Sequence, residues 1–336
     1  MKKICVLLVV CAASIILMLS PVNLQSGTDG PKKYQLTLVD NKTKKIKVMT
    51  PKLIQGGATA PEEFAVYSTG KIDDVEITLI DANKNEAYDE KGQDAILIGK
   101  STYAIPVSRI INIKDKLYEC EIETDGRRIT LTPYQGECGV VDMLSDFKCP
   151  LKFEMLILNS SDIFLDVSKS KTALVPCGSY SLWMGYITDK KSSVVLKNGE
   201  MKAIEVTKEE DPDGKKKALK IQWGAPFRLD CFCSLQDNKV AISESVTAYG
   251  SAGEEYYNFI PSVLPASVEI FDAAKKSVAK GAISRSIAGT NCQNVNNEVK
   301  GGYNGTIKKG AEPPYTLKIA VKNSLLGELK GEKEIK

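Results

Sequence analysis

The sequence predicts an all-β fold, made of two or three tandem β-sandwich-like domains with little helix. Short segments rich in β-branched residues recur about every 8–12 residues, and Gly, Asp, Asn or Pro bounds each of them, which is typical of sandwiches. No segment carries the long apolar stripe of period ~3.6 that indicates an amphipathic helix. The chain has 336 residues, of which 43% are hydrophobic, so it is long enough for several cores.

The first predicted domain covers residues 32–145 and begins with a hairpin. Residues 34–39 and 46–49 each alternate between apolar and polar side chains, with a polar turn between them. A second turn is predicted at Asp125-Gly126, a dipeptide that favours tight hairpins. The other strands expected in this domain are 64–67, 75–80, 95–98, 109–113, 117–122 and 128–131.

Two further domains are predicted at residues 150–224 and 226–330. The strand pair 267–271 and 277–284 resembles part of an immunoglobulin-like or fibronectin-like unit, and the whole chain resembles exported β-sandwich proteins of no particular family. The remaining strands are expected at 151–158, 163–167, 173–175, 180–187, 219–223, 227–233, 239–248 and 315–321.

Residues 1–26 have the features of a secretory signal peptide. Met1-Lys2-Lys3 is basic, and the apolar run that follows is shorter than the ~20 residues that usually span a bilayer. The protein is therefore expected to be exported to the periplasm, the cell surface or the medium. Two alternatives remain open: the segment stays uncleaved as an N-terminal anchor, which would be the only membrane contact, or Cys11 carries a lipid.

Residue usage narrows the chemistry. The chain has no histidine, which rules out Ser-His-Asp and Cys-His catalysis and removes most zinc sites. The formal charge of +3 gives no reason to expect nucleic acid as a partner. Seven of the nine cysteines follow Cys11, an odd number that does not suit a full disulfide framework. Cys138 with Cys149 is the candidate bridge, and the others are expected to be small buried hydrophobes.

One acidic run, between two apolar β-like segments, has residue types suited to binding a hard cation. Its Asp and Asn side chains alternate at the start, so that positions one, three and five of a tight loop face one centre. Ca²⁺ takes ~6–8 oxygen ligands in such loops. The predicted ligands of a structural Ca²⁺ site are Asp81, Asn83, Asn85, the carbonyl of Ala87, Asp89 and Asp94.

This run resembles the first half of an EF-hand calcium loop and the looser calcium loops of secreted bacterial modules such as dockerins. It differs from the EF-hand pattern at two positions, because Glu86 stands where that family has Gly and Gly92 where it has a bidentate Glu. The flanking segments are also predicted to be strands and not helices. Two other interpretations stay open: an ordinary turn rich in Asp and Asn, or a loop fastened by its own hydrogen bonds.

Weaker candidates for chemistry are two acidic pairs, Glu121 with Glu123 and Glu254 with Glu255. Paired carboxylates hydrolyse glycosides when they flank the scissile bond. Such pairs are also common on solvated sheet faces.

An aromatic strand could instead offer rings to a sugar. Tyr180 and Tyr186 share one face of the predicted strand 180–187 by parity, and Trp183 lies on the other. The expected function is that of an exported, non-catalytic binding or structural protein, whose partner is a cell-surface polymer or a protein. A carbohydrate-binding surface protein is the first alternative, and a carboxylate-dependent glycoside hydrolase is the second.

Overall fold

The described residues form no helix and lie mostly in β-strands, which confirms the all-β prediction. Among them, no helix has the length and apolar character needed to cross a membrane. The predicted signal segment 1–26 and Cys292 lie outside the described part of the chain. The computed structural model describes residues 30–41, 44–50, 61–189, 191–210, 213–214, 216–260, 266–283, 302–323 and 325–335.

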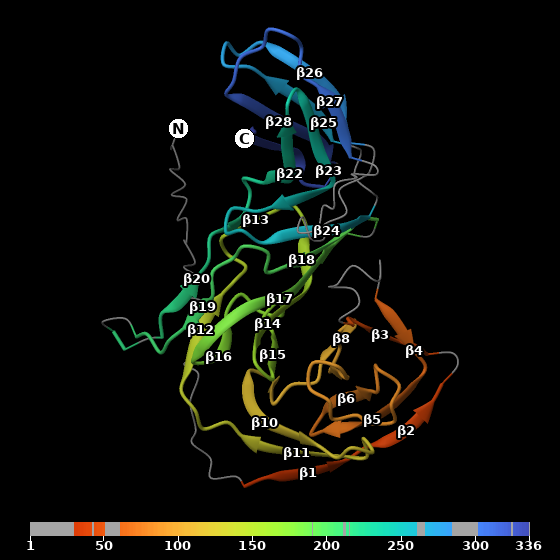
Figure 1. Ribbon diagram of the computed structural model, residues 1–336. Coiled ribbons are helices and arrows are strands. Elements are labelled where there is room, and N and C mark those ends of the chain that lie inside the picture. Colours follow the sequence, from red (N-terminus) through yellow and green to blue (C-terminus); the bar gives the residue numbers. More distant parts are fainter. Residues whose placement is uncertain are drawn as a thin grey trace, which may run out of the picture.

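The first eleven strands form the N-terminal region, at the opposite end of the molecule from the C-terminal strands (Figure 1). Within the described residues they make a seven-stranded sheet, β2-β5-β6-β7-β8-β3-β4, and a four-stranded sheet, β1-β11-β10-β9. The strands are β1 (Lys32–Gln35), β2 (Thr37–Asp40), β3 (Ile46–Val48), β4 (Glu62–Phe64), β5 (Val66–Ile72), β6 (Val75–Ile80), β7 (Ala95–Ile98), β8 (Tyr103–Pro106), β9 (Ile110–Ile113), β10 (Lys116–Ile122) and β11 (Arg128–Pro133).

The two sheets of this region pack face to face as a β-sandwich. Ile77 and Leu79 of β6 lie in one core with Ile111 of β9 and Ile129 of β11, and all four side chains are at most 2% exposed. Burying a side chain of this size contributes about 1.5–3 kcal/mol. Alternation along these strands therefore sets which face of each sheet turns inward.

The predicted hairpin between residues 34–39 and 46–49 is wrong. The first segment is divided at Leu36, so β1 pairs with β11, β2 pairs with β5, and β3 pairs with β4 and β8. Leu36 is 6% exposed, and its amide donates to the carbonyl of Arg127 at 2.8 Å. Burial of this leucine turns the chain from one sheet to the other. An alternating pattern alone cannot show such a switch, because it is the same on either sheet.

The predicted Asp125-Gly126 turn is confirmed. β10 and β11 pair antiparallel on either side of it, and Gly126 has a φ of 67°. The hairpin predicted at residues 267–271 and 277–284 is confirmed too, as β25 and β26.

The remaining strands form the second region. They are β12 (Cys138–Asp142), β13 (Phe147–Lys148), β14 (Lys152–Ser160), β15 (Ile163–Asp166), β16 (Ala173–Pro176), β17 (Gly178–Thr188), β18 (Ser193–Lys197), β19 (Ile204–Val206), β20 (Ala218–Lys220), β21 (Trp223–Gly224), β22 (Arg228–Gln236), β23 (Lys239–Tyr249), β24 (Glu255–Ile260), β25 (Ser267–Phe271), β26 (Ser277–Ala282), β27 (Tyr303–Thr306), β28 (Tyr315–Asn323) and β29 (Gly327–Ile335).

One sheet runs through most of this second region. In the described residues it has thirteen strands, with the order β15-β14-β17-β18-β24-β23-β22-β29-β28-β25-β26 and with β19 and β27 at its sides. β18 pairs with β24 through Val195↔Tyr257 and Leu196↔Tyr256. This pairing crosses the boundary predicted between residues 224 and 226, and the number of domains stays a prediction.

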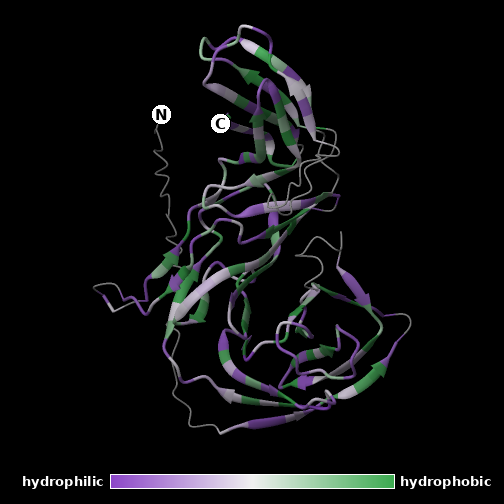
Figure 2. Ribbon diagram, in the orientation of Figure 1, coloured by the Kyte–Doolittle hydropathy of each residue, from purple (hydrophilic) through white to green (hydrophobic). Residues whose placement is uncertain are grey.

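Trp223 anchors the middle of the second region. Its side chain is fully buried, and its Nε1 donates to the carbonyl of Met143 at 2.8 Å. Phe147 and Phe153 pack on it with ring centroids at 4.6 and 5.3 Å. Hydrophobic and hydrophilic residues alternate along the surrounding strands (Figure 2), as expected when one face of each strand is buried.

Candidate functional site

The acidic loop, residues 81–94, joins β6 to β7 as the sequence predicts. Tyr88 fixes its middle, because the ring is 8% exposed within the sandwich core and its amide donates to the carbonyl of Thr124 at 3.0 Å. A Cβ on Gly126 would lie 2.7 Å from Cγ of Tyr88, so only glycine permits this approach. The loop is therefore held against the β10–β11 turn.

Asp81 organises the first half of this loop. Its Oδ1 accepts the amides of Lys84 at 2.6 Å and Asn85 at 3.1 Å, and its Oδ2 accepts the amide of Glu86 at 2.8 Å. Lys84 and Glu86 have φ values of 64° and 68°. Glu86 thus adopts the left-handed conformation that the EF-hand resemblance expects of a glycine, at a cost of about 1–2 kcal/mol.

Three polar side chains converge above Asp81. The Nδ2 atoms of Asn83 and Asn85 donate to Oε2 of Glu90, at 2.6 and 2.5 Å. Asn85 also accepts the amide of Ala87 at 3.0 Å through its Oδ1. Glu90 was missed by the sequence analysis, because it falls outside the alternating pattern of the predicted ligands. The signal that could have found it is an acid between Asp89 and Asp94 at the loop's end.

Asp94 lies beneath the loop and is 1% exposed. Its Oδ1 accepts the amide of Ala82 at 3.2 Å, and its Oδ2 accepts the amide of Glu90 at 2.9 Å. Burial raises the pKa of this carboxyl to about 6, and the negative charges of Asp81 and Glu90 act in the same direction. The backbone hydrogen bonds lower the pKa but do not offset the burial.

The structure brings together only part of the predicted ligand set. Asp89 points away from the loop's centre and accepts a hydrogen bond from Oγ1 of Thr124 at 3.2 Å. Among the described residues, no three His, Cys, Asp or Glu side chains are grouped closely enough to hold a metal ion. A cation in the loop would therefore depend on Asn oxygens and carbonyls as well as carboxylates. Asn83 fits this need, because a half-turn of its amide would present Oδ1 where Nδ2 now stands.

The end of the loop reaches the junction between the two regions. The amide of Gly92 donates to the carbonyl of Val107 at 3.1 Å, and the amide of Val107 donates to the carbonyl of Asp94 at 2.8 Å. A Cβ on Gly92 would lie 2.9 Å from Cζ of Phe164, a residue of β15. The acidic loop therefore packs directly on the second region.

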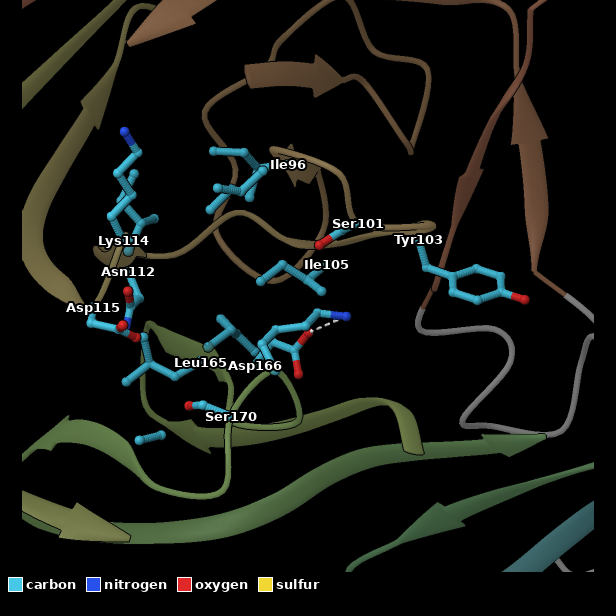
Figure 3. Close-up of a pocket in the computed structure, with 15 residues that line it drawn as sticks. Ile96, Ser101, Tyr103, Ile105, Asn112, Lys114, Asp115, Leu165, Asp166 and Ser170 are labelled. Atoms are coloured by element: carbon cyan, nitrogen blue, oxygen red, sulfur yellow. Dashed lines mark ion pairs between the residues drawn. The ribbon is translucent and has the colours of Figure 1, made fainter. Parts of the chain in front are cut away.

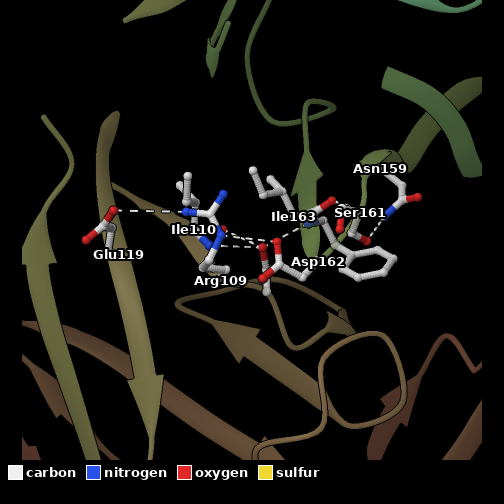
Figure 4. Close-up of polar contacts among 9 residues, drawn as sticks. Arg109, Ile110, Glu119, Asn159, Ser161, Asp162 and Ile163 are labelled. Carbon is white, nitrogen blue, oxygen red and sulfur yellow. Dashed lines mark hydrogen bonds and ion pairs between the residues drawn. The ribbon is translucent and has the colours of Figure 1, made fainter. Parts of the chain in front are cut away.

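Ser108 and Arg109 make the polar part of this junction. The buried Oγ of Ser108 accepts the amide of Phe164 at 2.8 Å and donates to the carbonyl of Ile110 at 2.6 Å. Arg109 donates its amide to the carbonyl of Asp162 at 2.9 Å and its Nε to the Asp162 carboxylate at 3.1 Å, as Figure 4 shows. The contacts of Ser108 with Phe164 and of Arg109 with Asp162 join residues more than fifty positions apart.

The parity prediction for the aromatic strand is wrong. A bulge lies between the pairs Leu182↔Leu158 and Met184↔Ile157, where Trp183 is the extra residue of β17. A bulge exchanges the faces of the residues that follow it. Tyr180 consequently lies in the large core, whereas Trp183 and Tyr186 pack together on another cluster. Trp223 is fully buried and offers no exposed ring to a sugar.

The two acidic pairs have separate partners. The Glu123 carboxylate pairs with Arg128 at 2.6 Å. Glu254 is fully buried, and its carboxylate accepts the amides of Gly224 at 2.6 Å and Ala252 at 3.1 Å and the hydroxyl of Tyr256 at 3.0 Å. Burial raises the pKa of Glu254, while these hydrogen bonds act in the opposite direction. Glu255 pairs with Lys197 at 3.2 Å.

The described cysteines are free thiols, and the candidate bridge between Cys138 and Cys149 is not formed. Cys120 and Cys231 are buried, as expected of small hydrophobes, whereas Cys177 and Cys233 are only partly buried. Burial raises the pKa of the Cys120 thiol to about 12, which keeps it protonated at neutral pH.

No protein-family model matches this chain, and no curated protein sequence matches it significantly. The similar solved structures include β-glucuronidase from Ruminococcus gnavus in complex with C6-substituted uronic isofagomine, at 8% identity and a TM-score of 0.18. The complex of the same enzyme with D-glucaro 1,5-lactone has 9% identity and a TM-score of 0.18. Each match covers 92% of this chain but only 46% of the other. Similarity this low supports no conclusion about fold or function.

Proposed function

We propose that this chain is an exported, non-catalytic binding or structural protein, and that Ca²⁺ bound by the acidic loop stabilises its N-terminal region. The observation that carries the proposal is the buried carboxyl of Asp94 beside Asp81 and Glu90, whose negative charges help to raise its pKa to about 6. A cation among these groups would offset both the repulsion and the desolvation.

The loop's conformation supports the same proposal. The backbone wraps around the Asp81 carboxylate and places Asn83 and Asn85 on one side, with Glu90 opposite. The residues that would hold the ion are Asp81, Asn83, Asn85 and Glu90, with Asp94 beneath them. Bound only by the folded state, the ion would stabilise it by mass action.

Export is proposed from the sequence of the first residues. Met1-Lys2-Lys3 followed by a short apolar run is typical of a secretory signal. Proteins outside the cytoplasm use calcium sites with dissociation constants of about 10⁻⁴–10⁻³ M. A site made of two amides and a few carboxylates suits that range.

Thermal unfolding of the protein in excess Ca²⁺ and in chelator tests the calcium site. At a calcium concentration about 50-fold above Kd, we expect about 2 kcal/mol of stabilisation. Glu90→Gln should reduce the difference between the two conditions to near zero, because it removes one of the converging charges. Asp125→Asn is the control, since Asp125 is an acidic residue of another exposed turn whose carboxylate accepts a hydrogen bond, from the amide of Arg127 at 3.0 Å.

Two results would contradict the calcium proposal. One is an equal melting temperature in chelator and in about 50 mM Ca²⁺, which is ~50-fold above the weakest Kd expected. The other is a calcium effect that Glu90→Gln leaves intact, because the ion would then bind elsewhere. Mg²⁺ at the same concentration distinguishes a calcium loop from general screening of charge, since Mg²⁺ demands a smaller octahedral site.

A further inference from the structure

A cavity of about 250 Å³ lies where the two regions meet. The N-terminal region contributes residues of β7, β8 and the β9–β10 hairpin. The second region contributes β15, the segment after it and Ala173 at the start of β16. Ile96, Ile105, Ile111 and Leu165 line the cavity with aliphatic side chains (Figure 3). Small-molecule sites are concave, largely apolar and frequent at interfaces between domains, with few polar groups to orient the ligand.

Most of the charges at the mouth of this cavity are already neutralised. Lys114 forms an ion pair with Asp74, outside the cavity. Lys169 pairs with Asp166 at 3.2 Å and donates to the carbonyl of Glu154 at 2.8 Å. Neither lysine is available to an anion without losing an existing contact.

Asp115 is the exception at the cavity mouth. Within the described residues, its carboxylate has no hydrogen-bond or ion-pair partner. Among the described residues that line the cavity, Asp115 is therefore the charged group that a ligand can approach without displacing an ion-pair partner. Asn112, on the same hairpin, also lines the cavity and lies near Asp115 (Figure 3).

The turn that carries Asp115 is strained. Ile113 pairs with Lys116, so Lys114 and Asp115 form a two-residue turn, and their φ values are 52° and 61°. Turns of this kind favour Asn-Gly, and a long side chain such as that of Lys114 costs about 1–2 kcal/mol in the left-handed region, whereas Asp adopts it more readily. Strain of this kind is concentrated at functional sites. Here it holds a charged side chain at the cavity mouth where Gly would leave none.

We propose that this cavity binds a small primary amine with a branched aliphatic body. The body would contact Ile96, Ile105 and Leu165, and the ammonium group would lie against the Asp115 carboxylate. The amine could be a free metabolite or the first residue of a peptide with an aliphatic side chain. Both sources present the same chemistry, and the binding is non-covalent and separate from the proposed calcium site.

The test is ligand-observed NMR with three probes of nearly equal shape: 3-methylbutylamine, 3-methylbutanol and 3-methylbutanoate. A ligand of six or seven heavy atoms is expected to bind with a millimolar Kd. The amine should bind about tenfold more tightly than the alcohol, and the carboxylate should bind most weakly. Leucinamide and a peptide that begins with leucine, added as competitors, distinguish the free amine from a peptide terminus.

Two variants test separately the contact with the ammonium group and the contact with the aliphatic body. Asp115→Asn should bring the affinities for amine and alcohol together, and Ala173→Leu, which fills part of the cavity, should weaken all three probes. Asp40→Asn is the control, because Asp40 is an exposed aspartate on β2 and does not line the cavity. Melting curves confirm that each variant folds.

Three results would overturn the inference. If none of the three probes binds, the cavity is not a binding site for ligands of this class. Equal affinity for amine and alcohol in the unaltered protein would show that the ammonium group is not recognised, and that the cavity binds the aliphatic body alone. Amine binding that neither Asp115→Asn nor Ala173→Leu weakens would place the ligand elsewhere on the protein.

Discussion

Two loops of this protein are built around a buried carboxylate, and their surroundings differ. Asp94 lies under the acidic loop beside two further carboxylates, which raise its pKa together with burial. Glu254 lies in the loop between β23 and β24, and the groups facing it are hydrogen-bond donors. The second loop surrounds its carboxylate with donors, which oppose the rise in pKa that burial causes. The first loop places several carboxylates close together, and its hydrogen-bond donors offset their burial and repulsion only in part. A bound cation would therefore stabilise the first loop more than the second.

Glu254 closes its loop by reaching across it. Its Oε1 accepts the amide of Gly224, next to the buried Trp223, and its Oε2 accepts the amide of Ala252. A Cβ on Gly250 would lie 1.8 Å from Oε1, so the loop backbone and the carboxylate are in direct contact. A buried carboxylate with several donors stabilises a loop without any ion.

The largest effect is expected from Glu254→Ala. It leaves buried donors without acceptors, and each such donor costs about 1–3 kcal/mol. We expect a loss of about 3 kcal/mol or more in the free energy of unfolding, measured by urea denaturation. Glu254→Gln should fall between this variant and the unaltered protein, since its amide nitrogen would face a donor. Glu269→Gln, which alters an exposed pair with Lys280, should cost less than about 1 kcal/mol. An equally small loss in Glu254→Ala would show that the carboxylate does not close the loop.

Asp94 should make the N-terminal region sensitive to pH. Its folded-state pKa of about 6 lies above the 3.8 that is usual for aspartate, so its contribution to stability is complete below about pH 4 and is lost as the pH rises through 6. In chelator, we expect the free energy of unfolding to fall over this range by about 2 kcal/mol. Excess Ca²⁺ should reduce or reverse the fall, because a bound cation favours the charged carboxylate.

The Asp94→Asn variant checks the origin of this pH dependence. It should remove the fall between pH 4 and 6, whereas Asp89→Asn should leave it, since Asp89 points away toward Thr124. A fall that persists in Asp94→Asn would assign the titration to another group.

The junction provides the third test, because it joins the acidic loop to the second region. Ser108→Ala removes the acceptor for the buried amide of Phe164 and the donor to the carbonyl of Ile110. We expect a loss of about 1–2 kcal/mol. Hydrogen exchange should show faster opening at residues 162–164 and in β9, with β25–β29 unchanged. Protection that stays uniform would mean that Ser108 does not hold the two regions together.

The sequence predicted the strands well because burial on one face leaves a local signal. Alternating Val, Ile and Leu located β6, β7, β10 and β11 to within a residue or two. The prediction failed where the chain passes from one sheet to another, and where a bulge exchanges the faces of the residues that follow it. Leu36 turns the chain between sheets, and Trp183 is the extra residue of a bulge. Neither event alters the local pattern, since both depend on partners distant in the chain.

The candidate site was predictable only in part for a similar reason. Asp81, Asn83 and Asn85 follow the spacing of a tight loop, and the structure places them together. Glu90 follows no such spacing and reaches them because the loop folds back. Asp94 was predicted as an ion ligand, but its raised pKa arises from burial and from the charges of Asp81 and Glu90. Tertiary contacts supply these features, and sequence spacing does not contain them.

The smallest effect concerns Glu86, which stands where the EF-hand pattern has glycine. Glu86 has a φ of 68°, and its side chain is exposed. Its backbone amide donates to the Asp81 carboxylate. Glu86→Gly keeps that amide, removes the left-handed strain, and adds backbone entropy to the unfolded chain. Because these two effects oppose each other, we expect a gain of less than about 1 kcal/mol in chelator. Glu86→Ala keeps the strain and removes the same charge, so it isolates the backbone effect. If glycine destabilises the loop relative to alanine, the left-handed conformation at Glu86 is not a source of strain.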